Sequence, residues 1–182
     1  AAFGLTFLHQ LVSGSDITDH PSFRVFWLAL YAAVLLGVAV FRVGMPLVLF
    51  FRHRFVVERL VPESEDVTSV YIRGRNLAGF RARAGQFVIA RFLARGFIGE
   101  AHPFSLSAAP DGIALRLSIK RLGDFTARIP ALKPGTPVMI DGAHGVFTAA
   151  SGKADRVLLI AGGIGITPLR ALAEERLRSG RE

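Results

Sequence analysis

Apolar positions dominate the start of the chain, whereas apolar and polar positions alternate later. Residues 25–51 are apolar apart from Arg42, and their uninterrupted part, 25–41, reaches the length of a short membrane-spanning helix, about 17–25 residues. Pro46 predicts a kink or a helix end nearby. A second apolar segment, residues 1–13, comes before a short polar stretch. The pattern therefore predicts about two membrane helices within residues 1–54.

The charges that flank the apolar segment predict its orientation. Arg42, Arg52 and Arg54 lie at its second end, whereas the preceding loop, residues 14–22, contains two Asp and neither Lys nor Arg. Basic residues concentrate on the cytoplasmic side of membrane helices. We therefore expect residue 52 onward in the cytoplasm, in a multi-pass protein of the cell (inner) membrane that contacts the lipid bilayer. The alternative is a buried helix pair in a soluble protein.

From residue 55 onward the pattern becomes that of short strands. Runs rich in Val, Ile and Phe are separated by turn residues; these runs are FVVERLV, VTSVYIRG, GQFVIARFL, IALRLSIK and TPVMIDG. Short strands of this kind, joined by tight turns, are typical of small antiparallel sheets closed into a barrel. We expect an antiparallel β-barrel over residues 55–150.

Residues 151–182 predict one strand–loop–helix unit. RVLLIA is a continuous apolar run, which is typical of a buried parallel strand. A glycine loop follows it, and LRALAEERLRSG then reads as an amphipathic helix with Pro168 near its first turn. This is the opening unit of a nucleotide-binding α/β domain, in which the helix N-terminus attracts a diphosphate. Taken alone, the loop is also compatible with a tight turn that binds nothing.

Composition restricts the chemistry. The chain has no cysteine, which excludes disulfides, cysteine-ligated iron–sulfur clusters and a thiol redox pair. The net charge of +8 comes mainly from scattered arginines. Membrane-helix ends and phosphate sites account for them, so we do not expect nucleic-acid binding. The chain starts within an apolar segment and stops after one strand–loop–helix unit, so we expect it to be a fragment of a larger protein.

Four motifs, in order, resemble the ferredoxin–NADP reductase superfamily. The first, HPFS, matches the form found in its ferric reductase and NADPH oxidase branch, where other members have Arg-x-Tyr-Ser. GQF, on a strand before it, adds to the likeness. The apolar segments resemble the last two helices of the ferric reductase-like transmembrane domain. The motifs are HPFSLSAAP at 102–110, IKRLGDFT at 119–126, DGAHGVFT at 141–148 and LLIAGGIGITPLRAL at 158–172.

The resemblance implies a role for each matching residue. Phe104 would pack against the flavin ring of FAD, and Ser105 would hydrogen-bond near flavin N5, so these two are the expected catalytic residues. His102 would approach the FAD diphosphate, residues 123–126 would offer N–H groups and a hydroxyl to it, and residues 163–167 would hold the NAD(P)H diphosphate. The expected cofactor-binding residues are His102, Pro103, Phe104, Ser105, Ser107, Lys120, Gly123, Asp124, Phe125, Thr126, Gly162, Gly163, Ile164, Gly165, Ile166, Thr167 and Pro168.

Without the resemblance, Phe104 would read as a barrel core residue and Ser105 as a turn hydroxyl. The chain also departs from the superfamily pattern. His102 replaces an arginine, which predicts weaker or pH-dependent diphosphate binding. Phe104 lacks the tyrosine hydroxyl. Ala143 and His144 stand in place of a proline and an aromatic residue, which predicts a looser connection between the flavin and nicotinamide domains.

His9 is a candidate haem ligand. An ionisable residue in a membrane helix is a functional candidate by default, and in the resembled family pairs of histidines on two helices hold two stacked b-type haems. FLHQLVSGSD resembles the outer-leaflet member of such a pair. An interfacial histidine without a metal is the alternative. His20 and His53 are interpreted as loop and interface residues.

The predicted function is that of an NAD(P)H-dependent oxidoreductase, similar to ferric reductases and NADPH oxidases. It would pass electrons from NAD(P)H through FAD and haem to ferric iron, oxygen or another acceptor. One alternative is a haem-free flavin reductase module, bound to the membrane, that supplies electrons to a redox protein partner. Another is a non-catalytic membrane module that keeps the fold. Residues 151–182 carry only the start of the NAD(P)-binding domain, so the choice between NADH and NADPH is not encoded in them.

Overall fold

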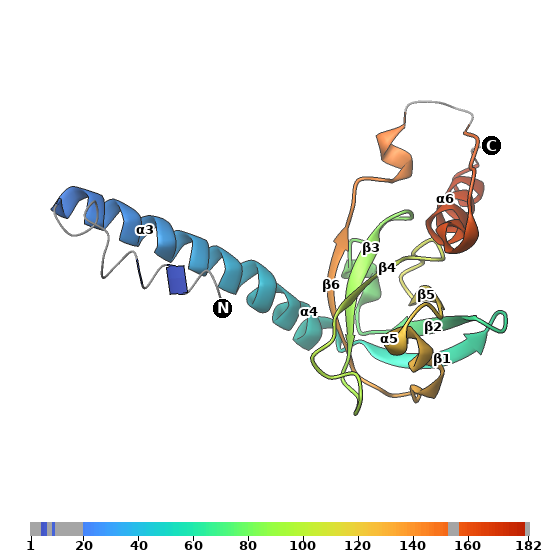
Figure 1. Ribbon diagram of the computed structural model, residues 1–182. Helices are drawn as coiled ribbons and strands as arrows, with labels where there is room; N and C mark the ends of the chain where they lie inside the picture. The colour runs from blue at the N-terminus through green and yellow to red at the C-terminus, as the bar shows by residue number, and fades with distance from the viewer. Residues whose placement is uncertain (1–4, 7–8, 10–19, 153–156, 181–182) are drawn as a thin grey trace. The chain divides into compact units, whose positions relative to one another are not determined.

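The computed structural model describes residues 5, 6, 9, 20–152 and 157–180 (Figure 1). The chain divides into a helical unit, residues 1–45, and a sheet unit, residues 46–182. The helical elements α3 (Pro21–Val38), the π-helical η1 (Ala39–Gly44) and α4 (Met45–His53) follow one another without a break.

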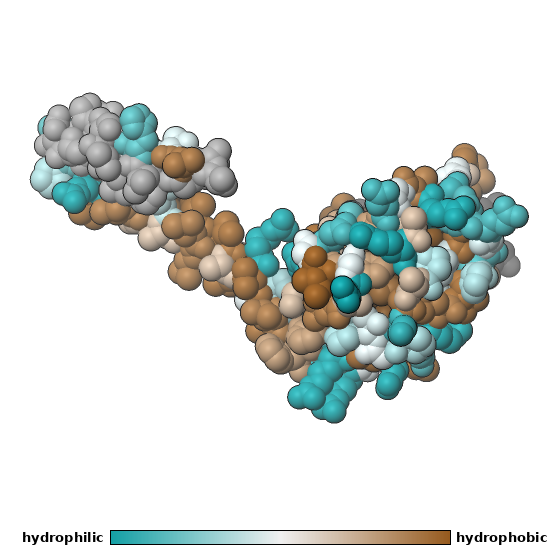
Figure 2. All heavy atoms as spheres, turned by 60° about the horizontal axis from the view of Figure 1, so that its bottom comes forward, coloured by the Kyte–Doolittle hydropathy of each residue, from teal (hydrophilic) through white to brown (hydrophobic). Residues whose placement is uncertain are grey.

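The helix is irregular where Pro46 predicts it. The segment η1 ends two residues before Pro46, which has no N–H for helical bonding, and the Met45 N–H bonds the Val40 carbonyl in the wider π pattern. The helix continues through Pro46 to His53 instead of ending there. No residue of α3 is buried, and brown apolar side chains cover much of its surface in Figure 2.

One helix in the described part of the chain, Pro21–His53, is long and apolar enough to cross a membrane, judged by length and composition. The expected helix over residues 1–13 lies mostly outside the described residues. Leu5, Thr6 and His9 are described, and all three are helical and exposed.

The sheet unit contains two three-stranded antiparallel sheets, β1-β2-β5 and β4-β3-β6. All five predicted strand runs form strands, but the predicted closed barrel is wrong. The two sheets meet through single bridges, Val56 to Pro137 and Leu106 to Leu117, instead of continuous ladders. The strands are β1 (Val56–Pro62), β2 (Val67–Arg73), β3 (Phe87–Phe92), β4 (His102–Ser105), β5 (Ala114–Lys120) and β6 (Val138–His144).

The core lies between the two sheets, and the alternation of side chains along a strand determines which residues belong to it. In β3, Val88, Ala90 and Phe92 are buried while their neighbours are half-buried, as expected when alternate side chains point to opposite faces. Short helical elements close the remaining sides. They are η2 (Leu77–Gly79), α5 (Asp124–Ala127), η3 (Ile129–Ala131) and η4 (Ala149–Ser151).

His53 is not the interface residue that the sequence suggests. It is 1% exposed, its Nδ1 lies 2.9 Å from the Arg75 carbonyl oxygen, and its ring stacks on Phe55 with centroids 5.2 Å apart. The Phe80 ring meets it edge-on at 5.6 Å. These aromatic neighbours bury the imidazole, and the last turn of α4 is therefore anchored within the sheet unit.

The C-terminal segment is only partly as predicted. The amphipathic helix is α6 (Ile166–Arg178), preceded by the short η5 (Gly163–Gly165). The predicted buried strand is wrong: residues 157–160 form no strand, and Leu158 is 84% exposed. A parallel strand is held by a neighbour's hydrogen bonds, and none of the described strands pairs with this run.

Helix α6 packs on the sheet unit through a small second core. Ala84, Ala109, Ala171 and Leu172 form this cluster. The Ala109 N–H donates to a Glu174 carboxylate oxygen at 3.0 Å, which fixes the helix against the segment after β4. The glycine loop at the start of α6 is thereby held beside β4 and β5.

Candidate functional site

One cavity of about 290 Å³, pocket A, brings three of the sequence motifs together. Its walls come from β4, from β5 with the turn after it, and from the glycine loop with the start of α6. The glycine loop is far from the other two segments in sequence. The lining residues are Pro103, Phe104, Ser105, Ser118, Ile119, Lys120, Leu122, Thr126, Ile164, Gly165, Thr167 and Pro168.

Strand β4 presents the HPFS motif to pocket A. Phe104 pairs with Val88 and Ser105 with Phe87, so β4 is fixed by β3 on one side only. Pro103 lacks an N–H and is tolerated because β4 is an edge strand. Phe104 is half-buried and packs against the main core, so it combines the core role with a face toward the pocket.

The turn after β5 is closed by Thr126. Its hydroxyl accepts the N–H groups of Leu122 at 2.8 Å and Gly123 at 3.0 Å, and donates to the Gly123 carbonyl at 3.0 Å. The Gly123 N–H and the Thr126 hydroxyl therefore already bond one another. Phe125 points into the core and is 5% exposed.

His102 lies beside pocket A without lining it. The centroid of its ring is 4.0 Å from that of the Phe125 ring, and its Nε2 is 3.6 Å from one carboxylate oxygen of Glu100. The other carboxylate oxygen of Glu100 pairs with Arg128 at 2.5 Å. The Arg128 Nε is buried without a hydrogen-bond partner among the described residues. Gly123, Asp124, Phe125 and Gly162 likewise do not line pocket A.

The glycine loop lies at one wall of the pocket. Gly163 has a φ of +55°, a left-handed conformation that favours glycine. The Thr167 hydroxyl donates to the Ile164 carbonyl at 2.9 Å and closes the first turn. The N–H groups of Gly165 and Ile166 already bond carbonyls of the loop, and Pro168 has no N–H, so the start of the 13-residue α6 attracts an anion through the positive end of its helix dipole.

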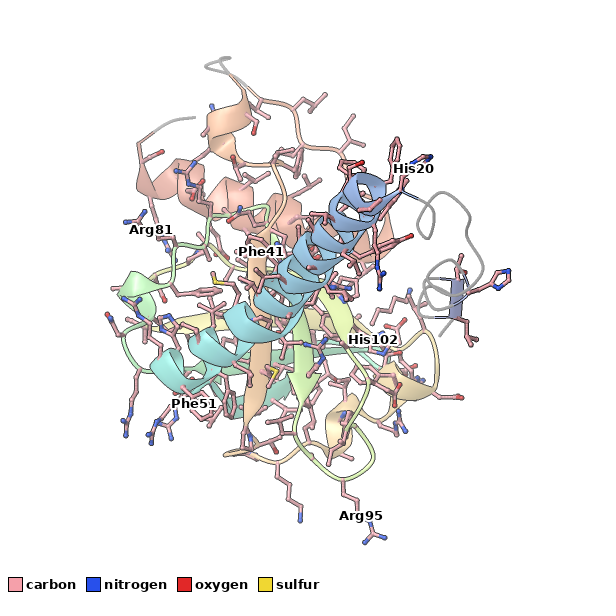
Figure 3. The ribbon with its side chains drawn as sticks, turned by 90° about the vertical axis from the view of Figure 1, so that its left-hand side faces the viewer. His20, Phe41, Phe51, Arg81, Arg95 and His102 are labelled. Atoms are coloured by element: carbon pink, nitrogen blue, oxygen red, sulfur yellow. The ribbon has the colours of Figure 1, made fainter. Side chains whose placement is uncertain are left out.

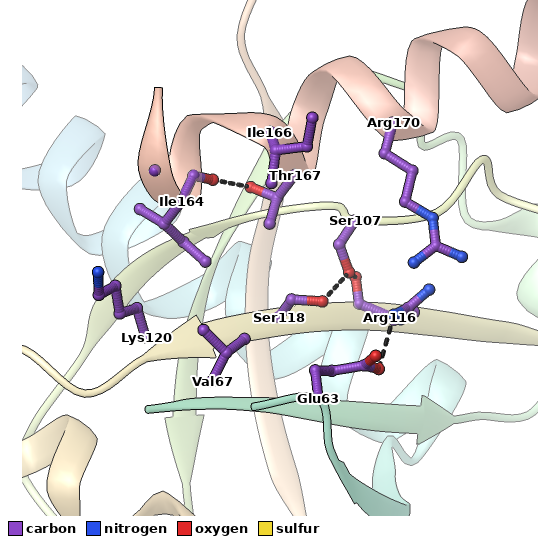
Figure 4. A pocket seen from close by; sticks show the side chains of 11 residues that line it. Glu63, Val67, Ser107, Arg116, Ser118, Lys120, Ile164, Ile166, Thr167 and Arg170 are labelled. Atoms are coloured by element: carbon purple, nitrogen blue, oxygen red, sulfur yellow. Dashed lines mark hydrogen bonds and ion pairs between the residues drawn. The ribbon is translucent and has the colours of Figure 1, made fainter. Parts of the chain in front are cut away.

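A second cavity of about 310 Å³, pocket B, adjoins the same loop (Figure 4). The predicted residues Ser107, Lys120, Gly163, Ile166 and Thr167 line it, and Ile164 lines both cavities. Sequence reasoning missed Ser118, which faces both cavities, and Arg116, Glu63, Val67 and Arg170 of pocket B.

Hydrogen bonds connect the polar wall of pocket B. Ser69 and Ser118 are cross-strand partners with oxygens 2.7 Å apart, and Ser118 donates to Ser107 at 2.9 Å. The buried Arg116 donates from Nε to Ser69 at 3.2 Å and from a terminal nitrogen to Glu63 at 2.7 Å. The period of two on β5 could have found Arg116 and Ser118, because they share a face with the predicted Lys120.

Two carboxylates near this wall are biased toward ionisation. A hydrogen bond from Ser69 lowers the pKa of Glu63 and the Arg116 charge adds to this, against a smaller opposing effect of burial. The pKa of Asp66 is also lowered, first by a hydrogen bond from Ser64 and then by Lys120, whose Nζ is 3.3 Å away. Glu63 and Asp66 are therefore anionic at neutral pH, and each lies beside one cation, Arg116 or Lys120.

The Glu63 pair predicts a pH-dependent contribution to stability. Since its folded pKa lies below the ordinary value of 4.5, the contribution is present above that pH and disappears as pH falls through the folded pKa. Because its side chain is 35% exposed, Glu63→Gln should lower the free energy of unfolding by only about 1 kcal/mol at neutral pH. Urea unfolding at pH 7 and near pH 3 measures this.

The control for that variant is Glu65→Gln, on the same hairpin and exposed. Its unfolding curve should match the unaltered protein at both pH values. A Glu63→Gln loss that persists unchanged in acid would contradict the ionised pair as its cause.

His9 is placed as a helical, exposed residue. Among the described residues there is no group of three or more His, Cys, Asp or Glu side chains that could hold a metal ion. His9 as a haem ligand therefore stays a prediction.

Comparison with known proteins agrees with this geometry, although no protein-family model matches the chain. A flavohemoprotein of Xylella fastidiosa is 29% identical over 126 residues, 67% of this chain and 32% of the relative. Dual oxidase 2 of Rattus norvegicus is 27% identical over 182 residues, 95% of this chain and 12% of that protein. The chain thus spans a third or less of these curated relatives.

A solved structure shows the same fold. The flavohem-like FAD/NAD-binding domain of nitric oxide dioxygenase from Vibrio cholerae has a TM-score of 0.59 and 25% identity, covering 69% of this chain and 57% of that one. An FAD/NAD-binding domain agrees with a sheet unit whose motif segments converge on one cavity. The chain is thus similar in sequence to dual oxidases and flavohemoproteins and in fold to an FAD/NAD-binding domain, which agrees with its resemblance to the ferredoxin–NADP reductase superfamily.

Proposed function

We propose that this chain is the central part of a membrane-bound oxidoreductase that passes electrons from NAD(P)H through FAD and haem to an acceptor such as ferric iron or oxygen. The observation that carries the proposal is pocket A, where β4, the turn after β5 and the glycine loop meet. The electron donor and the flavin must bind next to one another, and pocket A is the cavity that these three segments line together.

The residues of pocket A fit a flavin. Phe104, Ile119, Leu122 and Ile164 give it an apolar lining that excludes water, and the Ser105 hydroxyl supplies a hydrogen bond at its edge. The aromatic face of Phe104 would pack against the ring system. When bound, FAD supplies the chemistry: it accepts a hydride and releases electrons singly.

The glycine loop fits the diphosphate of NAD(P)H. Gly163 and Gly165 have open space where a Cβ would stand, so a ligand can approach their backbone closely. The start of α6 adds the positive end of the helix dipole. Lys120, on the opposite segment beside the turn that Thr126 closes, is the proposed ligand of the FAD phosphates.

Membrane attachment is supported by the helix Pro21–His53 and by the dual oxidase relative. That alignment covers 95% of the chain, whereas the sheet unit, residues 46–182, makes up three quarters of it, so the likeness extends into the helical unit. We place the protein in the cell (inner) membrane as a multi-pass protein, with the sheet unit cytoplasmic. His9 is the proposed ligand of a b-type haem.

The test is an anaerobic absorbance experiment on the purified full-length protein. Flavin and haem bands should both be present, and NADPH or NADH should bleach the flavin before the haem becomes reduced. His9→Ala should remove haem absorbance and leave flavin bleaching intact. A protein that bleaches its flavin and has no haem band would favour the haem-free reductase with a protein partner; bound flavin that neither nucleotide bleaches would refute the proposed electron transfer.

A further inference from the structure

The sheet unit has an uncompensated group of arginines around the base of α4. Residues 46–57 and 71–86 contain six arginines and no Asp or Glu. All six are exposed, and none takes part in the ion pairs found between described residues. This arginine collar consists of Arg52, Arg54, Arg73, Arg75, Arg81 and Arg83.

Contacts within the sheet unit bring the two stretches together. The Arg75 N–H donates to the His53 carbonyl at 2.5 Å, and Arg73 is the cross-strand partner of Val56. Phe80, next to Arg81, places its ring 5.6 Å from that of His53. The collar therefore gathers where α4 ends, and Figure 3 shows the Arg81 side chain pointing outward at the edge of this side of the unit.

Charge is polarised along the β1–β2 ribbon. The collar lies at the end where Val56 pairs with Arg73, whereas the hairpin at the opposite end, residues 63–66, contains three acidic residues. Seven residues of strand separate the two ends by about 23 Å. An anionic surface would therefore attract the collar end more strongly than the hairpin end, where Glu63 and Asp66 are paired with Arg116 and Lys120.

The chain itself brings the collar to a membrane surface. Residues 25–45, helical throughout and apolar except Arg42, extend about 32 Å as a helix. This matches the hydrocarbon core of a bilayer, about 30 Å, and α4 follows within the sheet unit. If this helix spans the membrane, Arg52 and Arg54 emerge at the level of the lipid phosphates, and the rest of the collar lies within reach of the same surface.

An open groove of about 420 Å³ lies beside the collar. Arg81 and Arg83 line it, together with the Gln86 amide and the hydroxyls of Thr148 and Ser151. The Gln86 amide and the Ser151 hydroxyl already donate to backbone carbonyls, so the two guanidinium groups are the donors that would bind phosphate oxygens. The groove thus offers a defined place for one headgroup within a broader basic surface.

We propose that the arginine collar binds anionic phospholipid headgroups and docks the sheet unit on the membrane with its acidic hairpin pointing away. This inference rests on the proposed membrane attachment and adds a lipid-binding site to it. Each basic residue near an anionic surface should favour the docked state about fivefold. The collar would thereby restrict the orientation of the unit that carries pocket A.

The composition of the chain makes the test specific. Since it contains no cysteine and one tryptophan, Ala78→Cys can carry a single fluorophore inside the collar, while Trp27 reports helix insertion. The labelled full chain is placed in nanodiscs of phosphatidylcholine, with or without phosphatidylglycerol. A quencher attached to the lipid headgroups lowers the fluorescence of the label when the collar docks. Brominated acyl chains lower the fluorescence of Trp27 when the helix is inserted. A Glu65→Cys label reads the acidic hairpin.

Phosphatidylglycerol should increase quenching of the label at residue 78 but not at residue 65. About 1 M salt, where the Debye length is about 3 Å, should remove that increase. Reversing four charges, R73E/R75E/R81E/R83E, should weaken docking more than about a hundredfold. The matched control is Arg121→Glu, an exposed arginine beyond the opposite end of the ribbon, where Val67 pairs with Lys120; it should dock as the unaltered chain does.

The two proposals fail separately in this experiment. Quenched Trp27 with equal label quenching in both lipids would overturn the collar while leaving the membrane helix in place. Unquenched Trp27 with phosphatidylglycerol-dependent label quenching would overturn the membrane helix and support the collar. An equal effect of Arg121→Glu and the fourfold variant would show a general charge effect and refute a site at the collar.

Discussion

Replacing Gly85 with alanine is expected to remove much of the folding stability of the sheet unit. A Cβ at this position would lie 1.9 Å from the Phe147 carbonyl oxygen, and the residue has a φ of +86°. Left-handed backbone costs a residue with a side chain about 1–2 kcal/mol, and a forced backbone shift adds about 1–3 kcal/mol. We expect a total loss of about 2–5 kcal/mol in the free energy of unfolding.

Gly96→Ala separates the two contributions. Gly96 has the same φ of +86°, but nothing lies within 4 Å of the point where its Cβ would stand. It should lose only the backbone part, about 1–2 kcal/mol. Urea unfolding of both variants measures the difference; equal losses would show that the close approach between Gly85 and the segment around Phe147 is not rigid.

Strand positions could be predicted from the sequence because their signal is local. The runs around Val57, Ile72 and Val88 are rich in Val, Ile and Phe and are bounded by turn residues, and the structure buries these three residues. Closure of the barrel could not be predicted in the same way, because it depends on hydrogen-bond registers between strands. At the seam between the sheets only isolated bridges form, such as Leu106 to Leu117.

Long-range neighbours explain the remaining differences. His53 follows a membrane-like helix and therefore suggests an exposed position, but the ring of Phe80, 27 residues later, covers it. The apolar run at residues 157–160 predicts a strand, yet a strand also needs a partner, and none of the described strands pairs with it. The local pattern predicts which structure a segment tends to form, and contacts with distant segments determine which structure it adopts.

The candidate site was predictable where a motif is contiguous. Phe104, Ser105 and Gly165 belong to short contiguous patterns, and pocket A brings them together. Ser118 and Arg116 belong to no such pattern. Their period of two with Lys120 on β5 places them on one face of the strand, but only the fold shows that this face borders the cavities.

Replacing Gly165 with valine is expected to block transfer from NAD(P)H to the flavin while leaving the fold intact. Gly165 has an ordinary helical conformation, φ −59° and ψ −12°, and nothing lies within 4 Å of a Cβ there. Because Gly165 lines pocket A, added side-chain volume would displace the nicotinamide or its diphosphate. A misplacement of about 1 Å can cost about a hundredfold in rate.

Gly152→Val is the matched control. Gly152 is an extended glycine, with φ −110° and ψ 139°, that also has open space around a Cβ and lies outside the glycine loop. Its FAD content and its rate of flavin reduction should equal those of the unaltered protein. A comparable loss in this variant would assign the Gly165→Val effect to general disturbance of the sheet unit.

The most direct measurement is the rate of flavin bleaching after anaerobic rapid mixing of the FAD-loaded full-length protein with NADPH or NADH. We expect rapid bleaching in the unaltered protein and in Gly152→Val, and bleaching at least about a hundredfold slower in Gly165→Val at unchanged FAD content. Gly165→Val that holds FAD and bleaches at the unaltered rate would contradict the meeting of flavin and nicotinamide nucleotide in pocket A.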